Sequence, residues 1–184
     1  MGREMTLRGV IKTNMSTNSA TAYQNIESDL ALSYESPDRT KGWKVTGAWA
    51  WIDTEAQNSI TSNNNPALTA CLSTDELTPG SLMDITTAAD NRLCAWAQIH
   101  YRGFDTGDYF VPHASIPESN RFLIDFDRIV TNDLYIYGVC VANGGITGTM
   151  PVDINYMVSL EEVTLSPSQS VLQQLKGIGQ DVVN

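Results

Sequence analysis

The stretch GWKVTGAWAWID, residues 42–53, carries the pattern that decides the fold. Large apolar side chains occupy its odd-numbered positions, namely Trp43, Val45, Trp49 and Trp51. Polar residues such as Lys44 and Thr46 lie between them. Successive side chains of a β-strand point to opposite faces, so an alternation with a period of two indicates a strand with one apolar face.

The row formed by Trp43, Trp49 and Trp51 has two interpretations. Facing inward, the three indoles fill a core, and each removes roughly 150–250 Å² from water. Facing outward, they form a flat aromatic platform for sugar rings, which predicts a carbohydrate-binding module. We favour the core, because the tryptophans are mixed with Val45 and Gly47.

The same alternation recurs along most of the chain, whereas helical periodicity is nearly absent before residue 166. Further strands are expected at residues 5–11, 26–34, 67–73, 91–101, 121–128, 134–142 and 154–160, with a bulge at residues 161–162. Residues 134–142 are nearly all apolar, which is typical of a strand covered on both sides. Residues 103–117 hold Gly, Asp and Pro and predict a loop. About eight strands at this spacing predict an all-β fold, a single antiparallel β-sandwich of the jelly-roll type.

A short α-helix is expected at the C-terminus. Ser166-Pro167-Ser168-Gln169 has the order of a capping box, with proline at the first helical position. One apolar stripe follows, formed by Val171, Leu172, Leu175 and Ile178. We therefore divide the chain into a sandwich domain, residues 1–165, and an amphipathic tail, residues 166–184. The stripe has two interpretations: it packs on its own domain, or it docks on a neighbouring copy. Because the sandwich does not need this stripe in order to close, we predict the contact with a neighbouring subunit.

The charge of the chain is strongly acidic. Eleven Lys and Arg against 21 Asp and Glu give a net charge of −10. The basic residues are scattered, whereas binding to a phosphate backbone requires clustered ones, so we expect no direct contact with nucleic acid. The chain has no apolar run of the length that a membrane-spanning helix needs, and we expect no secretory signal peptide.

No combination of residues predicts a catalytic centre, a metal site or a cofactor, and we expect the protein not to be an enzyme. His100 and His113 have no partner motif. Asp125 and Asp127 lie two apart and point the same way on a strand, which suits a solvated face; with Asp133 they could instead ligate calcium. The three cysteines (Cys71, Cys94 and Cys140) lack paired zinc spacing and predict small buried residues.

Four segments resemble small capsid proteins of tailless bacterial or archaeal viruses. They are GWKVTGAWAW (42–51), DNRLCAWAQ (90–98), RFLIDFDRIVTNDLYIYGV (121–139) and LSPSQSVLQQLKGIGQD (165–181). In that group a single jelly roll is followed by a short helical tail. The resemblance covers about half of the chain.

The resemblance implies a structural subunit of the virion that assembles with copies of itself and with other virion proteins. This chain lacks the basic N-terminal arm with which many capsid proteins hold the genome. Genome packing would then rely on another protein, on counterions or on an internal membrane layer. Whether this chain contacts such a membrane is left open at this point. The alternative function is a carbohydrate-binding or host-attachment module on the same fold, which an exposed tryptophan row would favour.

Overall fold

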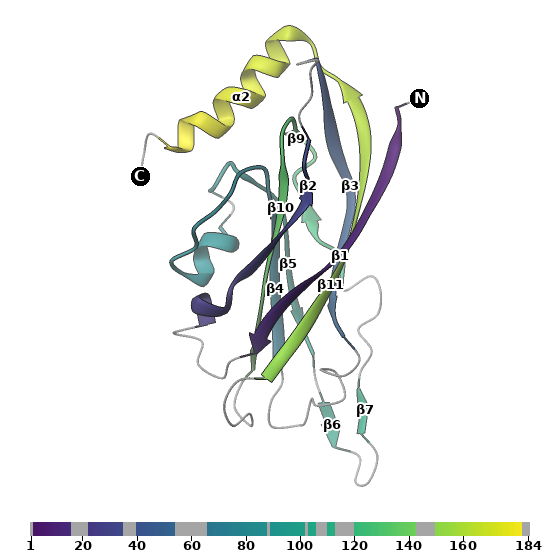
Figure 1. Cartoon of the computed structure of the whole chain (residues 1–184), viewed down its shortest axis with the longest axis vertical. Helices are drawn as coiled ribbons and strands as arrows, with labels where there is room; N and C mark the ends of the chain where they lie inside the picture. The colour runs from purple at the N-terminus through teal and green to yellow at the C-terminus, as the bar shows by residue number, and fades with distance from the viewer. Residues whose placement is uncertain are drawn as a thin grey trace.

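The computed structural model describes residues 2–15, 22–34, 40–53, 66–87, 89–101, 103–105, 110–112, 120–142 and 150–181. These residues are mostly β-strand, and one α-helix follows at the C-terminal end (Figure 1). The elements are β1 (Glu4–Met15), η1 (Ala22–Asn25), β2 (Glu27–Leu32), β3 (Lys41–Ile52), β4 (Pro66–Ser73), η2 (Leu82–Ile85), β5 (Leu93–His100), β6 (Gly103–Asp105), β7 (Phe110–Pro112), β8 (Leu123–Ile124), β9 (Ile129–Val130), β10 (Leu134–Ala142), β11 (Met150–Thr164) and α2 (Pro167–Asp181).

The strands form two antiparallel sheets that pack face to face. The first sheet has the order β1-β11-β3-β9 and the second has the order β2-β10-β4-β5-β8. The pairing is nested: β1 pairs with β11, β2 with β10, β3 with β9, and β4 with β5. Two further pairs, β11 with β3 and β10 with β4, roll this long hairpin into two layers. This winding is a jelly roll, which confirms the predicted all-β sandwich with a C-terminal helix.

The main core lies between the two sheets, where inward-facing side chains from both layers meet. Leu72 and Ile136 of the second sheet and Ile154 of the first are fully buried there. The sheets approach each other closely at Gly138, since a Cβ atom there would lie 3.0 Å from Cδ1 of Ile154 and 3.2 Å from Cδ1 of Ile11. Any larger side chain at this position would push the layers apart.

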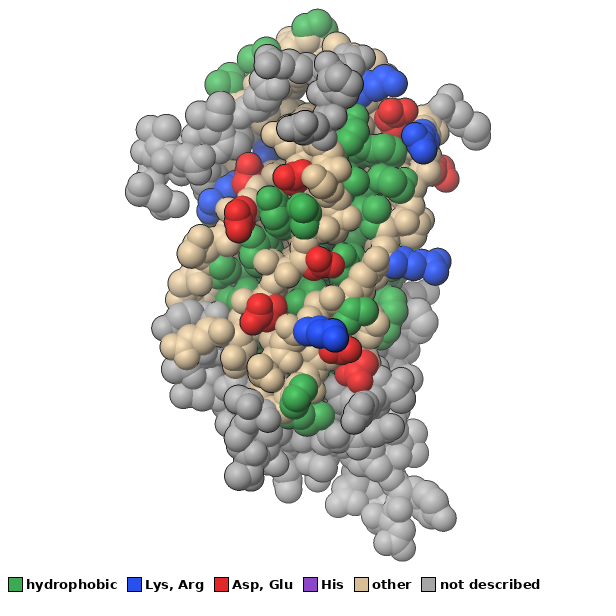
Figure 2. Space-filling view, in the orientation of Figure 1, with side chains coloured by type: hydrophobic (Ala, Val, Ile, Leu, Met, Phe, Trp, Pro, Cys, Tyr) green, Lys and Arg blue, Asp and Glu red, His purple; other side chains and the backbone are tan. Residues whose placement is uncertain are grey.

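The core is less completely covered along the side where β1 and β2 lie next to each other. Met5 and Leu7 of β1 and Leu32 of β2 are only half-buried. Figure 2 shows hydrophobic side chains among scattered charged ones on this side. Deeper in the same region, Tyr156 donates a hydrogen bond from its hydroxyl to Oδ2 of Asp29 at 2.6 Å. The carboxylate of Asp29, on β2, thus links the second sheet to Tyr156 of the first sheet along this side.

A second apolar cluster covers the outer face of the second sheet. Leu77 and Ile85, from the connection between β4 and β5, pack on Cys71, Tyr137 and Val139 of the sheet. The Leu77 backbone N–H donates to the Tyr137 hydroxyl at 2.6 Å. Strand β10 is therefore covered on both faces, as its continuous apolar sequence predicted.

The structure differs from the sequence-based predictions at residues 121–128 and 103–117. Residues 121–128 do not form one strand: β8 ends at Ile124, and a turn follows in which Asp125 Oδ1 accepts the N–H of Asp127 at 3.0 Å. This is the local bond by which aspartate favours turns over strands. Within the predicted loop 103–117, the described residues form a short hairpin of β6 and β7. Residues 106–109 and 113–117, with His113, lie outside the described residues.

Candidate interaction surfaces

Helix α2 begins with the predicted capping box. The Gln169 N–H donates to Oγ of Ser166 at 3.3 Å, and the Ser166 N–H donates to Oε1 of Gln169 at 3.0 Å. Two backbone donors that have no partner inside the helix are satisfied in this way. The strand β11 ends at Thr164 and the helix begins at Pro167, so only the two residues Leu165 and Ser166 connect them.

One face of α2 rests on the sandwich. Ser170 is 6% exposed, and Nε2 of Gln173 donates to the backbone oxygen of Asp127 at 3.0 Å. Leu165, just before the helix, is buried, and its N–H donates to the oxygen of Thr40. In Figure 1 the helix leaves the end of β11 and runs across one end of the sandwich. The contact is made mainly by small or polar side chains.

The apolar stripe faces away from the sandwich. Val171, Leu172 and Leu175 are 55%, 58% and 56% exposed. Ile178 lies within α2, but its side chain is outside the described part of the structure. Two more large apolar side chains are exposed near the turn that α2 contacts, Leu123 at 74% and Phe126 at 55%. An exposed apolar stripe along a helix is typical of a contact surface.

The three tryptophans do not share one face, contrary to the prediction. Val45 pairs with Leu160 while Gly47 pairs with Ser159, so Thr46 is an extra residue, a β-bulge, in β3. Before the bulge the odd positions face inward, and after it the even positions do, with Ala48, Ala50 and Ile52 fully buried. The bulge lies in β3 and not at the predicted residues 161–162.

The bulge therefore separates Trp43 from Trp49 and Trp51. Trp43 is 5% exposed and makes an edge-to-face contact with Tyr34, with ring centroids 6.0 Å apart. Trp49 and Trp51 are half-buried on the outer face of the first sheet. Only Trp43 fills the core as we expected.

The aspartates proposed as a calcium alternative do not gather. The Asp125 carboxylate is used inside its own turn, and Asp133 accepts the Tyr34 N–H at 3.1 Å. Among the residues that the structure describes, no group of three or more His, Cys, Asp or Glu side chains is placed to hold a metal ion. His100 lies exposed on β5, as predicted.

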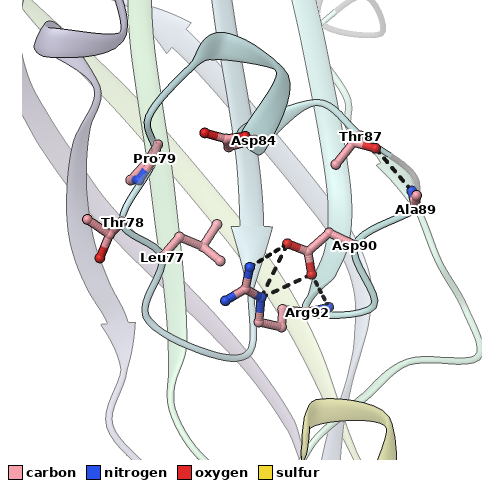
Figure 3. A pocket seen from close by; sticks show the side chains of 8 residues that line it. All are labelled: Leu77, Thr78, Pro79, Asp84, Thr87, Ala89, Asp90 and Arg92. Atoms are coloured by element: carbon pink, nitrogen blue, oxygen red, sulfur yellow. Dashed lines mark hydrogen bonds and ion pairs between the residues drawn. The ribbon is translucent and has the colours of Figure 1, made fainter. Parts of the chain in front are cut away.

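A polar hollow of about 350 Å³ lies beside η2 (Figure 3). On one wall Arg92 donates to both carboxylate oxygens of Asp90, with Nη2 at 2.8 Å. Burial raises the pKa of Asp90, but the hydrogen bonds and the charge of Arg92 outweigh it and hold that pKa below its ordinary value. On another wall Asp84 accepts the N–H groups of Gly80 and Ser81. These contacts brace the β4–β5 connection.

All three cysteines are buried and free, as predicted. Burial raises the pKa of the Cys140 thiol to about 12. Burial also raises the pKa of Cys94 to about 12, although the charge of Arg128 opposes it. A thiol of this kind stays protonated at neutral pH and is a poor nucleophile.

No protein-family model and no curated protein matches the chain. In the part of the chain that the structure describes, no helix is long and apolar enough to cross a membrane. The fold and its surfaces define the class: a jelly-roll β-sandwich with a capped C-terminal helix whose apolar stripe is exposed.

Proposed function

We propose that this protein is a structural subunit of a viral capsid that assembles with copies of itself in the virion. The jelly-roll winding supports this, because the fold is used by viral capsid proteins, although lectins and cupins share it. A fold alone does not define a function. The proposal therefore depends on a surface that needs a partner.

The exposed stripe of α2 is the observation that carries the proposal. Among the described residues, none of the core between the sheets comes from α2, and Val171, Leu172 and Leu175 remain more than half exposed. Covering an apolar side chain of this size contributes roughly 1.5–3 kcal/mol. The helix stripe on one copy and Leu123, exposed beside Trp96 on the outer face of the second sheet of another copy, are two different apolar surfaces. Contacts between unlike surfaces build rings or extended arrays.

Salt should favour the assembly. A subunit with a net charge of −10 repels its copies, and that repulsion is screened over about 10 Å at 0.1 M salt and about 3 Å at 1 M. An acidic chain does not neutralise the phosphates of a nucleic acid. The genome would then be packed with the help of another virion protein, of counterions or of a membrane layer.

Negative-stain electron microscopy of the purified chain at low and high salt tests the proposal. We expect regular lattices or closed particles at high salt. Leu172→Ser combined with Leu175→Ser should abolish them, whereas Leu30→Ser, which changes a comparably exposed leucine on β2, should not. Monomers under every salt condition would contradict the proposal.

A further inference from the structure

The outer face of the first sheet carries two neighbouring indoles. Trp49 pairs across the sheet with Met157, and Trp51 pairs with Asn155. Directly paired residues of antiparallel strands project on the same face. Trp49 and Trp51 are two residues apart on β3, so their Cα atoms lie about 7 Å apart along the strand. Adjacent aromatic rings with this spacing suit adjacent rings of an oligosaccharide.

The Trp49 indole lies over the backbone of the strand. The glycine two residues earlier, Gly47, leaves the space that the ring occupies, because a Cβ atom at Gly47 would overlap Cη2 of Trp49. A ring placed over a glycine covers the bare backbone with one face and presents the other outward. The aliphatic face of a pyranose ring, with its hydroxyl groups at the rim, is complementary to such a surface.

Two guanidinium groups flank the indoles. Arg121 is paired with Trp49 in a β-bridge along the edge of β3, and Arg8 is paired with Met157 on the other side of the same row. Both arginines are exposed, and among the described residues neither makes an ion pair. The row Arg8, Met157, Trp49 and Arg121 thus places a positive charge at each end of an apolar strip. In a chain with a net charge of −10, this row carries two positive charges and no carboxylate. Carboxylates of the same face, Asp53 and Asp153, lie beyond Trp51 and Asn155.

We propose that this face binds an acidic oligosaccharide. Sugar rings stack on Trp49 and Trp51, and a carboxylate or sulfate of the sugar pairs with Arg121 or Arg8. Asn155, half-buried beside Trp51, supplies an amide within reach of the hydroxyl groups. A polynucleotide suits the face less well, since it brings a charge with every nucleotide, and the net charge of the chain repels a polyanion. The site does not depend on assembly, so its test is independent of the test of the capsid proposal.

Isothermal titration calorimetry of the full chain with three probes tests the site. The probes are a tetrasaccharide of galacturonic acid, a neutral glucan tetrasaccharide and an oligothymidylate. We expect the acidic tetrasaccharide to bind more tightly than the other two. Trp49→Ala and Trp51→Ala should each weaken it roughly ten-fold or more. Arg121→Gln combined with Arg8→Gln should remove the preference for the acidic sugar over the neutral one, because both guanidinium groups of the row are then gone.

Trp96→Phe is the matched control, because Trp96 is a half-buried tryptophan on the second sheet. The affinity of this variant for the acidic tetrasaccharide should equal that of the unchanged protein. The unfolding midpoint of each variant is measured as well, to check that the fold is retained. The proposal is overturned by no binding of the acidic tetrasaccharide, by equal affinity for the neutral one, by tighter binding of oligothymidylate, or by unchanged affinity in both tryptophan variants.

Discussion

The sandwich and helix α2 differ in how far their apolar side chains are exposed to water. Between the sheets, Leu72, Ile136 and Ile154 are completely removed from water. On the helix, Leu172 and Leu175 keep more than half of their surface exposed. The stability of the fold thus resides in the two sheets, and we propose that the apolar surface of the helix stabilises a contact between molecules. Substitutions in the two regions should therefore separate folding from assembly.

The largest effect is expected in the core. Ile154→Ala should lower the free energy of unfolding by about 2–5 kcal/mol, because it leaves a cavity between closely packed sheets. Leu175→Ala, on the helix, should cost less than about 0.5 kcal/mol. Urea unfolding followed by fluorescence measures both. Equal losses would show that the helix belongs to the folding core.

A smaller loss is expected from overpacking at Gly138, where the facing sheet lies close. Gly138→Val should cost about 1–3 kcal/mol, since the new methyl groups meet Ile154 and Ile11 from the facing sheet. Gly80→Ala is the control, because the nearest atom to its new Cβ is a carboxylate oxygen 3.7 Å away. A neutral Gly138→Val would mean that the layers are free to separate.

Alkaline pH should weaken the sandwich through its buried thiols. Burial raises the pKa of Cys140 in the folded protein to about 12 from an ordinary 9.0. The thiol therefore stabilises the fold fully below pH 9, and this contribution is lost as the pH rises from 9 toward 12. At pH 10 the loss is about 1 kcal/mol for this group.

Cys140→Ala should show a correspondingly smaller drop in unfolding free energy between pH 8 and pH 10. The helix variant Leu172→Ser with Leu175→Ser should retain the drop of the unchanged protein. An identical pH dependence in Cys140→Ala would contradict the burial of this thiol.

The smallest effect on the sandwich is expected from the helix cap. Ser166→Ala removes the oxygen that accepts the Gln169 N–H and should weaken α2 by about 1 kcal/mol. Hydrogen exchange of the helix amides should accelerate, while exchange in β10 and β11 stays unchanged. Ser168→Ala leaves the bonds between Ser166 and Gln169 intact and is the control. Faster exchange throughout the sheets would mean that the helix supports the sandwich.

Much of this fold is readable from the sequence because alternation and capping are local. The strand at residues 134–142, covered on both faces, and the capping box at Ser166 were both predicted and are both present. Strand pairing is not local, and neither is a bulge. Thr46 is extra only with respect to β11, so nothing in residues 42–53 shows that the inward face changes there.

The same reasoning explains the other errors. Ala31 in β2 and Cys94 in β5 are also extra residues opposite shorter partners, and each changes which side chains face inward. Simple alternation along residues 26–34 would place Leu30 on the inner face with Leu32 and Asp29 on the outer face, but Leu30 is 45% exposed and Asp29 accepts a hydrogen bond from Tyr156. The exposed face carrying Trp49 and Trp51 could not have been found by counting positions. The apolar stripe on α2 could be found by counting positions, because a helix has no register with a partner strand.

Sedimentation velocity across a range of protein concentrations, at low and high salt, tests the central claim most directly. The unchanged chain should form species much larger than its 20.2 kDa monomer as concentration and salt rise. The variant Leu172→Ser with Leu175→Ser should remain monomeric with the same free energy of unfolding. A monomer at every concentration and salt, or a helix variant that assembles as well as the unchanged chain, would contradict the account.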